Sequence, residues 1–331
     1  MRQILEYHPV IGYRFVPKIK ARLPHEAGGY LVRTNNWGFR SEYDFFKAKG
    51  DKFRILLFGD SYTAGDGVSN GKRYSDFLEK ELDDVEVYNF GLPGTGTDQQ
   101  YLTFLEYGKD IEFDLLVIGL QVENIRRIVV QNRVYQNENG ESVVYEKPYF
   151  SLHQGELKLN NVPPKKEGIP LSAFSKSSNS EMDRGGRFQL LRKMINRLGL
   201  RDLVQKLTGY NPLPEYDSKE NEAWKLMAAL IKKWTKAQEK PVVVMTIPLY
   251  QHVEETSSAV SYQERFKELN QGGQFILYDP LDDFLSFSKK ERMKFRFGKD
   301  VHFTEEGHQV IAHSLAKVVK KLKEERKVLS H

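Results

Sequence analysis

Residues of the types used in acyl transfer follow separate apolar segments of this sequence. The hydroxyl of Ser61, the glycine Gly94 and the amide of Asn124 stand just beyond the first, second and third segments. Asp300 and His302 stand together in the stretch that follows the last segment. Acyl transfer requires a nucleophile, a base, a group that orients the base and donors for an oxyanion. These five residues are therefore the candidates for an active site.

Each candidate also has a simpler explanation when it is taken alone. Ser61 could be the N-cap of the helix that follows it, and Asn124 could cap another helix. Gly94 could serve only a tight turn, and His302 could be packed in the core. A shared site is favoured because complementary residue types follow successive apolar segments, an arrangement that chance seldom produces.

The elements that must position these residues are buried parallel strands. Short apolar runs alternate with stretches of helical period, and buried parallel strands are typically such continuous runs. We therefore predict an α/β fold with a doubly wound, parallel, five-stranded sheet flanked by helices. In such sheets sites form beyond the carboxyl ends of the strands, so the candidates share one rim. The predicted strands are Arg54–Phe58, Val85–Phe90, Leu115–Leu120, Val242–Ile247 and Gln274–Tyr278, and the predicted helices are Tyr74–Leu82, Asp98–Tyr107, Phe188–Leu207, Lys219–Ala237 and Glu305–Val328, the last with Thr304 as its cap.

The third and fourth predicted strands are much further apart than a normal crossover requires, which indicates an insertion. We assign residues 51–125 and 240–331 to the catalytic α/β unit. Residues 126–239 form an inserted cap region of β-hairpins and helices, and residues 1–50 form an irregular N-terminal layer.

The insert is polar and charged rather than apolar. The turn sequences Asn139-Gly140 and Gln154-Gly155 predict two β-hairpins in its first half. Residues 163–186 are rich in Pro, Ser, Lys and Gly and predict a loop. Polar walls with scattered aromatic rings suit a carbohydrate or another polar ester better than a lipid; the aromatic residues are Tyr135, Tyr145, Tyr149 and Phe150.

Composition excludes several other functions. The chain of 331 residues has no cysteine, which excludes disulfides, thiolate metal sites and a cysteine nucleophile. Its 50 Lys and Arg residues against 45 Asp and Glu leave a formal charge of only +5, too small to indicate a nucleic-acid partner. The histidines show no metal-binding spacing. Neither a signal-peptide core nor a membrane-spanning run is evident, so we expect a cytoplasmic protein without a membrane partner.

Three blocks of the sequence resemble those of the SGNH hydrolases, also called GDSL esterases and lipases. RILLFGDSYTAGDGVSN is similar to their first block, NFGLPGTGTDQQ to their second and DVHFTEEGHQVIA to their last. GYLVRTNNWGFRSEYD is like the N-terminal segment of a bacterial branch of this family. The resemblance covers about residues 1–125 and 240–320 and implies a three-layer, flavodoxin-like fold.

The resemblance also implies a role for each candidate. Ser61 Oγ would attack an ester carbonyl, His302 would accept its proton and Asp300 would orient the imidazole. The backbone N–H groups of Ser61 and Gly94 and the side-chain amide of Asn124 would bind the oxyanion. This chemistry implies no metal and no organic cofactor.

The sequence departs from the family pattern at two places. The third block reads VENI at residues 122–125, where the family usually has Gly-x-Asn-Asp, so Glu123 is the alternative to Asn124. Asp300 stands two residues before His302, whereas the family's aspartate usually stands three before its histidine. Other carboxylates could therefore orient the histidine; these are Asp279, Asp282 and Asp283.

We expect a serine esterase that acts through an acyl-enzyme on a small acyl ester, acetyl foremost, of a carbohydrate or other polar substrate. Its partner would be a small-molecule or glycan ester. One alternative is an O-acyltransferase that uses the same triad with a sugar acceptor. Another, of a different class, is a binding protein whose oxyanion hole has been lost through the altered third block.

Overall fold

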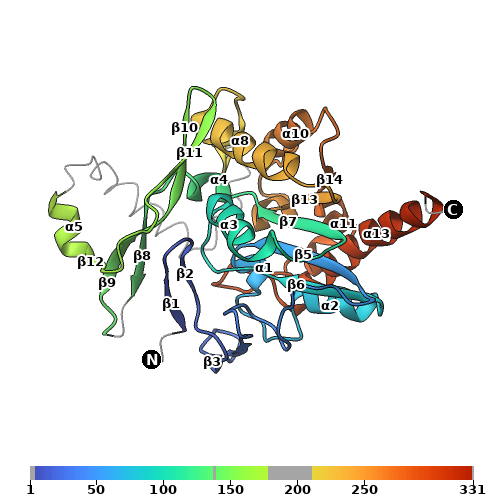
Figure 1. The fold of residues 1–331 in the computed structure, drawn as a ribbon, viewed down its shortest axis with the longest axis horizontal. Coiled ribbons are helices and arrows are strands. Elements are labelled where there is room, and N and C mark those ends of the chain that lie inside the picture. The colour runs from blue at the N-terminus through green and yellow to red at the C-terminus, as the bar shows by residue number, and fades with distance from the viewer. Residues whose placement is uncertain (1–3, 137–138, 178–210, 330–331) are drawn as a thin grey trace.

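The centre of the molecule is a five-stranded parallel sheet, seen in a computed structural model that describes residues 4–136, 139–177 and 211–329 (Figure 1). The strand order is β14-β13-β7-β5-β6, and every neighbouring pair is parallel. The predicted α/β fold with a doubly wound sheet is confirmed. The strands are β5 (Phe53–Gly59), β6 (Val85–Asn89), β7 (Leu115–Gln121), β13 (Val242–Ile247) and β14 (Ile276–Tyr278).

Alternate residues of β5 face opposite layers. Leu56 and Phe58 join one apolar cluster, and Ile55 and Leu57 join another on the opposite face. Both faces are covered by helices, which explains why the strands are continuous apolar runs. The first face is covered by α3 (Thr97–Thr103), the π-helix η1 (Phe104–Gly108), α8 (Glu222–Lys236) and α10 (Val260–Leu269), and the second by α2 (Tyr74–Glu81), α11 (Leu281–Leu285) and α13 (Glu305–Leu329).

The helices predicted inside the described ranges are present, with ends shifted by a few residues. Thr304 caps α13 as expected, because Thr304 Oγ1 accepts a hydrogen bond from Gly307 N at 3.4 Å. The predicted helix Phe188–Leu207 lies outside the described residues. Among the helices in the described ranges, none is long and apolar enough to cross a bilayer. The remaining helices are short: α1 (Ser61–Ala64), α4 (Asn124–Arg127), α9 (Tyr250–Val253), α12 (Lys289–Arg292) and the 3-10 helix η2 (Pro214–Tyr216).

The N-terminal layer is more regular than expected. Residues expected to be irregular form two antiparallel hairpins, each made of four-residue strands. Strands this short give little periodic signal, and their buried side chains Phe15, Tyr30 and Val32 join the apolar cluster of the main domain. They are β1 (Leu5–His8), β2 (Gly12–Phe15), β3 (Lys20–Leu23) and β4 (Tyr30–Arg33).

The insert contains both predicted hairpins. One turns at Asn139-Gly140 and the other at Gln154-Gly155, and each pair of strands is antiparallel. The segment 163–186 was expected to be a loop, and residues 163–168 have neither helix nor strand. The prediction is wrong for residues 169–177, which form β12 (Ile169–Pro170), paired with β9, and the helix α5 (Leu171–Ser177). Proline is tolerated in β12 because it pairs along one side only. The hairpin strands are β8 (Asn132–Gln136), β9 (Ser142–Glu146), β10 (Tyr149–His153) and β11 (Glu156–Asn160).

Candidate active site

Ser61 is placed by the sharp turn that joins β5 to α1. The Asp60 side chain accepts a hydrogen bond from Tyr62 N at 3.0 Å, so Asp60 is the N-cap and Ser61 is not. The turn requires glycine beside it, because a Cβ at Gly59 would lie 1.9 Å from Thr63 Oγ1. The Ser61 hydroxyl therefore has no capping role.

Ser61, His302 and Asp300 form one continuous hydrogen-bonded chain. His302 Nε2 lies 2.7 Å from Ser61 Oγ, and His302 Nδ1 lies 2.5 Å from Asp300 Oδ1. His302 N also donates to Asp300 Oδ1 at 3.0 Å. The spacing of two residues thus lets one carboxylate hold both the ring and the backbone of the histidine. A nucleophile, a base and an orienting carboxylate have this arrangement.

The other carboxylates considered for the orienting role have different partners. Asp279 accepts hydrogen bonds from Tyr262 and Gln263 on α10. Asp283 lies in α11 and accepts from Tyr278 and Lys317. Asp282 is exposed on the same helix. Within the described residues, Asp300 is the carboxylate hydrogen-bonded to His302.

The surroundings of His302 favour its protonated form. Burial alone lowers the pKa of this imidazole, but the hydrogen bond to Asp300 and the charges of Asp66, Asp300 and Asp60 outweigh burial, so the pKa of His302 is raised above 6.5. Burial raises the pKa of Asp300, but its hydrogen bonds with His302 and His25 and the His302 charge hold the pKa well below the usual range. An imidazolium that forms during proton transfer is therefore stabilised, while Asp300 remains ionised.

The N-terminal layer reaches the same carboxylate, which the sequence did not reveal. His25 Nε2 lies 3.1 Å from Asp300 Oδ2. The neighbouring Glu26 accepts hydrogen bonds from the backbone of Lys299 at 2.9 Å and of Asp300 at 2.7 Å. His25 also packs edge-on against the Phe297 ring at 4.4 Å. The turn that follows β3 therefore fixes the loop that carries Asp300.

The donors expected for an oxyanion are free within the described part of the chain. Neither Ser61 N nor Gly94 N donates a hydrogen bond there, and the same holds for Asn124 Nδ2. The Gly94 turn is held beside β5, because Leu92 N donates to Gly59 O at 3.1 Å. Buried donors are almost always paired in folded proteins, so a group of free ones at one rim suits a ligand oxygen.

Asn124 and Glu123 occupy different environments. Asn124 is the first residue of α4 and is fully buried, and neither atom of its amide has a partner in the described residues. Glu123 is 44% exposed, and its carboxylate lies 3.7 Å from Arg127. The structure thus places the Asn124 side chain inside and turns Glu123, its alternative, toward an arginine.

A buried ion pair lies beside the nucleophile. Arg127 Nη1 donates to Asp60 Oδ2 at 2.8 Å, and the Asp60 side chain is 0% exposed. Burial raises the pKa of Asp60 despite the opposing effect of the Arg127 charge. The pair joins α4 to the turn before Ser61. The sequence carried only a weak signal for it, two arginines directly after the third block.

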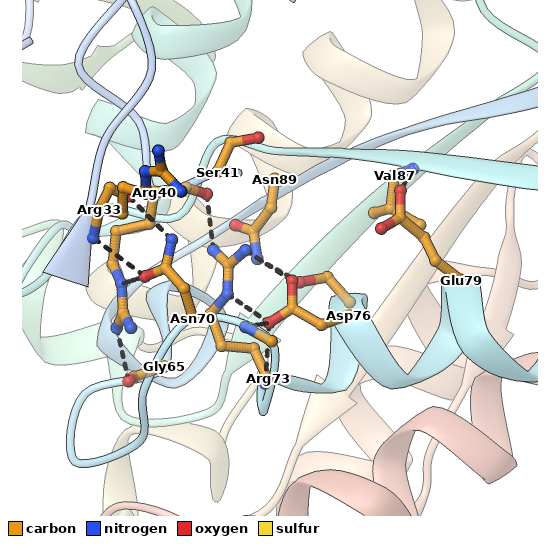
Figure 2. Close-up of polar contacts among 12 residues, drawn as sticks. Arg33, Arg40, Ser41, Gly65, Asn70, Arg73, Asp76, Glu79, Val87 and Asn89 are labelled. Atoms are coloured by element: carbon orange, nitrogen blue, oxygen red, sulfur yellow. Dashed lines mark hydrogen bonds and ion pairs between the residues drawn. The ribbon is translucent and has the colours of Figure 1, made fainter. Parts of the chain in front are cut away.

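Two buried arginines, one before and one after α1 in the chain, hold the loop that follows α1 (Figure 2). Arg40, from the N-terminal layer, donates to the carbonyls of Ala64 at 2.8 Å and Gly65 at 2.6 Å. Arg73 donates to Arg40 O at 2.7 Å and pairs with Asp76, as Figure 2 shows. Burial and the Arg73 charge lower the pKa of Arg40 to about 10. Arg40, in the N-terminal layer, thus holds the backbone that follows Ser61 in place.

In the described ranges, no group of three or more His, Asp or Glu side chains could hold a metal ion.

Comparison with known proteins gave one family. The family of GDSL-like lipases and acylhydrolases matches residues 55–315. No match was found among curated proteins. Similar solved structures include an acetyl xylan esterase, 15% identical over 81% of this chain and 100% of that chain, with a TM-score of 0.42. A psychrotrophic esterase from Pseudoalteromonas sp. is 12% identical over 82% and 98%, with a TM-score of 0.43. A lipase/acylhydrolase from Enterococcus faecalis is 14% identical over 81% and 96%, with a TM-score of 0.37.

Proposed function

This chain belongs to the family of GDSL-like lipases and acylhydrolases, and on that basis we propose that it is a serine esterase that hydrolyses a small acyl ester, acetyl foremost, of a carbohydrate or another polar alcohol. The observation that carries the proposal is the chain Ser61–His302–Asp300 with free donors beside it. The nucleophile, the base and the groups that stabilise charge are then all supplied by this chain.

In the first half of the proposed reaction, Ser61 Oγ attacks the ester carbonyl carbon while His302 Nε2 takes the hydroxyl proton. Asp300 holds the Nδ1 proton and offsets the charge of the imidazolium. The carbonyl oxygen becomes an oxyanion and accepts hydrogen bonds from Ser61 N, Gly94 N and the Asn124 amide. One such donor contributes about 3–4 kcal/mol to transition-state stabilisation in sites of this kind.

The tetrahedral intermediate collapses when His302 returns the proton to the departing alcohol oxygen, leaving an acyl group on Ser61. Water then attacks the acyl-enzyme, with His302 again acting as base, and releases the acid. Besides the groups of this chain, the first half uses only the ester and the second half only water.

Polar side chains beside Gly94 support a small, polar substrate. Tyr13 donates from its hydroxyl to Pro93 O at 2.6 Å. A Cβ on Gly94 would lie 2.3 Å from an Arg133 nitrogen, so the insert and the N-terminal layer both reach this turn. A long apolar acyl chain would have to displace these groups from their hydrogen bonds and water, which is costly.

Covalent labelling tests the proposal. A fluorophosphonate should modify Ser61 and abolish hydrolysis of p-nitrophenyl acetate. Ser61→Ala should escape the label and lose activity by a factor on the order of 10⁶. Ser286→Ala is the matched control, because the hydroxyl of this exposed serine donates to Asp283 O, away from the site, and the variant should be labelled like the wild type. Labelling at another serine, or activity in Ser61→Ala above a few per cent, contradicts the assignment.

A further inference from the structure

Arg133 lies against the glycine of the candidate oxyanion hole. It belongs to β8 of the insert, and its Nη2 atom would be 2.3 Å from a Cβ placed on Gly94. Because a Cβ is one bond from Cα, the guanidinium is in contact with the Gly94 backbone. Gly94 has φ of +76°, so glycine is also favoured there by conformation. The insert thus brings a positive charge to the position where the ester carbonyl would bind.

Unlike its neighbours, this charge has no anionic partner in the described residues. Arg127 pairs with Asp60, Arg126 with Glu215 and Lys147 with Asp98, all at 2.8 Å or less. Arg133 makes no ion pair with a carboxylate in the same part of the chain, although it is partly buried. The charge of Asp98 acts on it, but that carboxylate is already paired with Lys147. A partly buried cation loses hydration, and proteins usually compensate with a counter-ion. Its partner can therefore come with the substrate.

A buried phenol lies in the same place. The Tyr135 hydroxyl, two residues along β8, is buried without a well-formed hydrogen bond in the described residues, and it interacts with the Arg133 guanidinium and the Tyr13 hydroxyl. Its ring packs edge-on against Tyr13 at 5.5 Å, and the Tyr13 hydroxyl is already used on Pro93 O. A guanidinium in contact with Gly94 and a phenol beside that guanidinium thus form one cluster of hydrogen-bond donors.

We infer that Arg133 and the Tyr135 hydroxyl form a carboxylate-binding subsite beside Gly94, and that the ester substrate carries a carboxylate near the ester bond. The inference rests on the proposed esterase function and narrows its substrate class. The planar fork of arginine donates two parallel hydrogen bonds to a carboxylate, and a phenol can supply another. The carboxylate can belong to the acyl part or to the alcohol part of the ester, and the two cases are separable by experiment.

The test compares acids with neutral amides of the same shape. For the acyl side, the pair is p-nitrophenyl hemisuccinate and p-nitrophenyl succinamate. For the alcohol side, the pair is 3-acetoxybenzoate and 3-acetoxybenzamide. The measured quantity is the ratio of kcat/KM for the acid to kcat/KM for the amide. Because both values come from one preparation, a partly misfolded variant does not change the ratio.

In the wild type the ratio should exceed one for one of the pairs, and that pair identifies the side of the ester that carries the carboxylate. Arg133→Gln should lower this ratio by about tenfold or more, as expected for loss of a hydrogen bond to a charged group. Arg133→Lys should give an intermediate ratio, because it keeps the charge without the fork. Arg33→Gln, which removes an exposed arginine paired with Glu42, is the control and should leave the ratio unchanged.

A wild-type ratio at or below one for both pairs overturns the subsite, and so does an unchanged ratio in Arg133→Gln. Failure of the proposed function looks different. In that case the wild type hydrolyses neither member of either pair, Ser61 resists the fluorophosphonate, and both inferences are rejected together.

Discussion

His25 and His302 bind opposite oxygens of the same carboxylate, that of Asp300. His25 Nε2 lies 3.1 Å from Asp300 Oδ2, and His302 Nδ1 lies 2.5 Å from Asp300 Oδ1. Ala27 N donates to His25 Nδ1 at 3.2 Å, so Nδ1 is an acceptor and the proton of a neutral His25 is on Nε2. His25 therefore donates to Asp300 Oδ2, and the same ionised carboxylate accepts from His302 Nδ1 on its other oxygen.

His25 should act as a positioning residue. His25→Phe keeps a ring against Phe297 but removes the donor, and we expect kcat to fall about tenfold with little change in KM. Asp300 should then accept more strongly from His302, which moves the ascending limb of the kcat/KM pH profile to higher pH. His25→Gln can still donate to Asp300 and should recover most of the loss. Equal activity in the Phe and Gln variants, or a change in KM alone, contradicts this role.

Asp300 should be the carboxylate that orients the base. Asp300→Asn is expected to lower kcat by up to about 10⁴, because an amide favours the wrong tautomer of His302. The melting temperature and steady-state kinetics should be measured together to separate catalysis from folding. Asp282→Asn, an exposed position on α11, is the matched control and should behave like the wild type. If Asp300→Asn leaves kcat unchanged and the same substitution at Asp279 or Asp283 lowers it strongly, the orienting residue is one of those two.

The third block should work through Asn124. Asn124→Ala is expected to lower kcat by roughly 10²–10³ with little change in KM, because its hydrogen bond strengthens as charge builds on the oxygen. Glu123 is half-exposed beside Arg127, and an ionised carboxylate has no proton to donate, so Glu123→Gln should have a mild effect. The opposite result, a gain in Glu123→Gln and no loss in Asn124→Ala, would place Glu123 in the oxyanion position and favour a binding protein.

The pH dependence should follow His302. Its pKa is raised above 6.5, so the protonated, inactive form persists to higher pH and the rate rises as pH passes above this pKa. The charge of Asp66 contributes to the shift, so Asp66→Asn should move the ascending limb to lower pH. Asp110→Asn removes the same charge at an exposed position, 57% accessible, and should leave the profile in place. If the ascending limb of the pH–rate profile is at the same pH in Asp66→Asn as in the wild type, the protonation of His302 does not control the rate.

The sheet could be predicted because its signal is local. Each strand is an apolar run buried on both faces, and Ser61, Gly94 and Asn124 follow the carboxyl ends of three of these runs. The chain Ser61–His302–Asp300 could be expected for the same reason, since its members stand at the carboxyl rim or in a loop after the last strand.

The supporting groups could not be predicted, because each depends on packing between distant segments. No spacing relates His25 to Asp300, or Arg133 to Gly94, and the N-terminal hairpins carry too few residues to show a period. The Asp60–Arg127 pair depends on α4 lying beside the turn of α1, which only the assembled sheet determines. Short strands and single long-range contacts are where local sequence rules have least information.

The contact between His25 and Asp300 spans 275 positions of the chain, and it limits when the protein can act during synthesis. While the chain is still on the ribosome, the loop of residues 299–302 is among the last of these segments to emerge. Until it emerges, Ser61 lacks its hydrogen bond to His302 and His25 lacks its hydrogen bond to Asp300. Segments separated this far also close slowly. A nascent chain should therefore be unable to react with esters or with fluorophosphonate until both segments have emerged and docked.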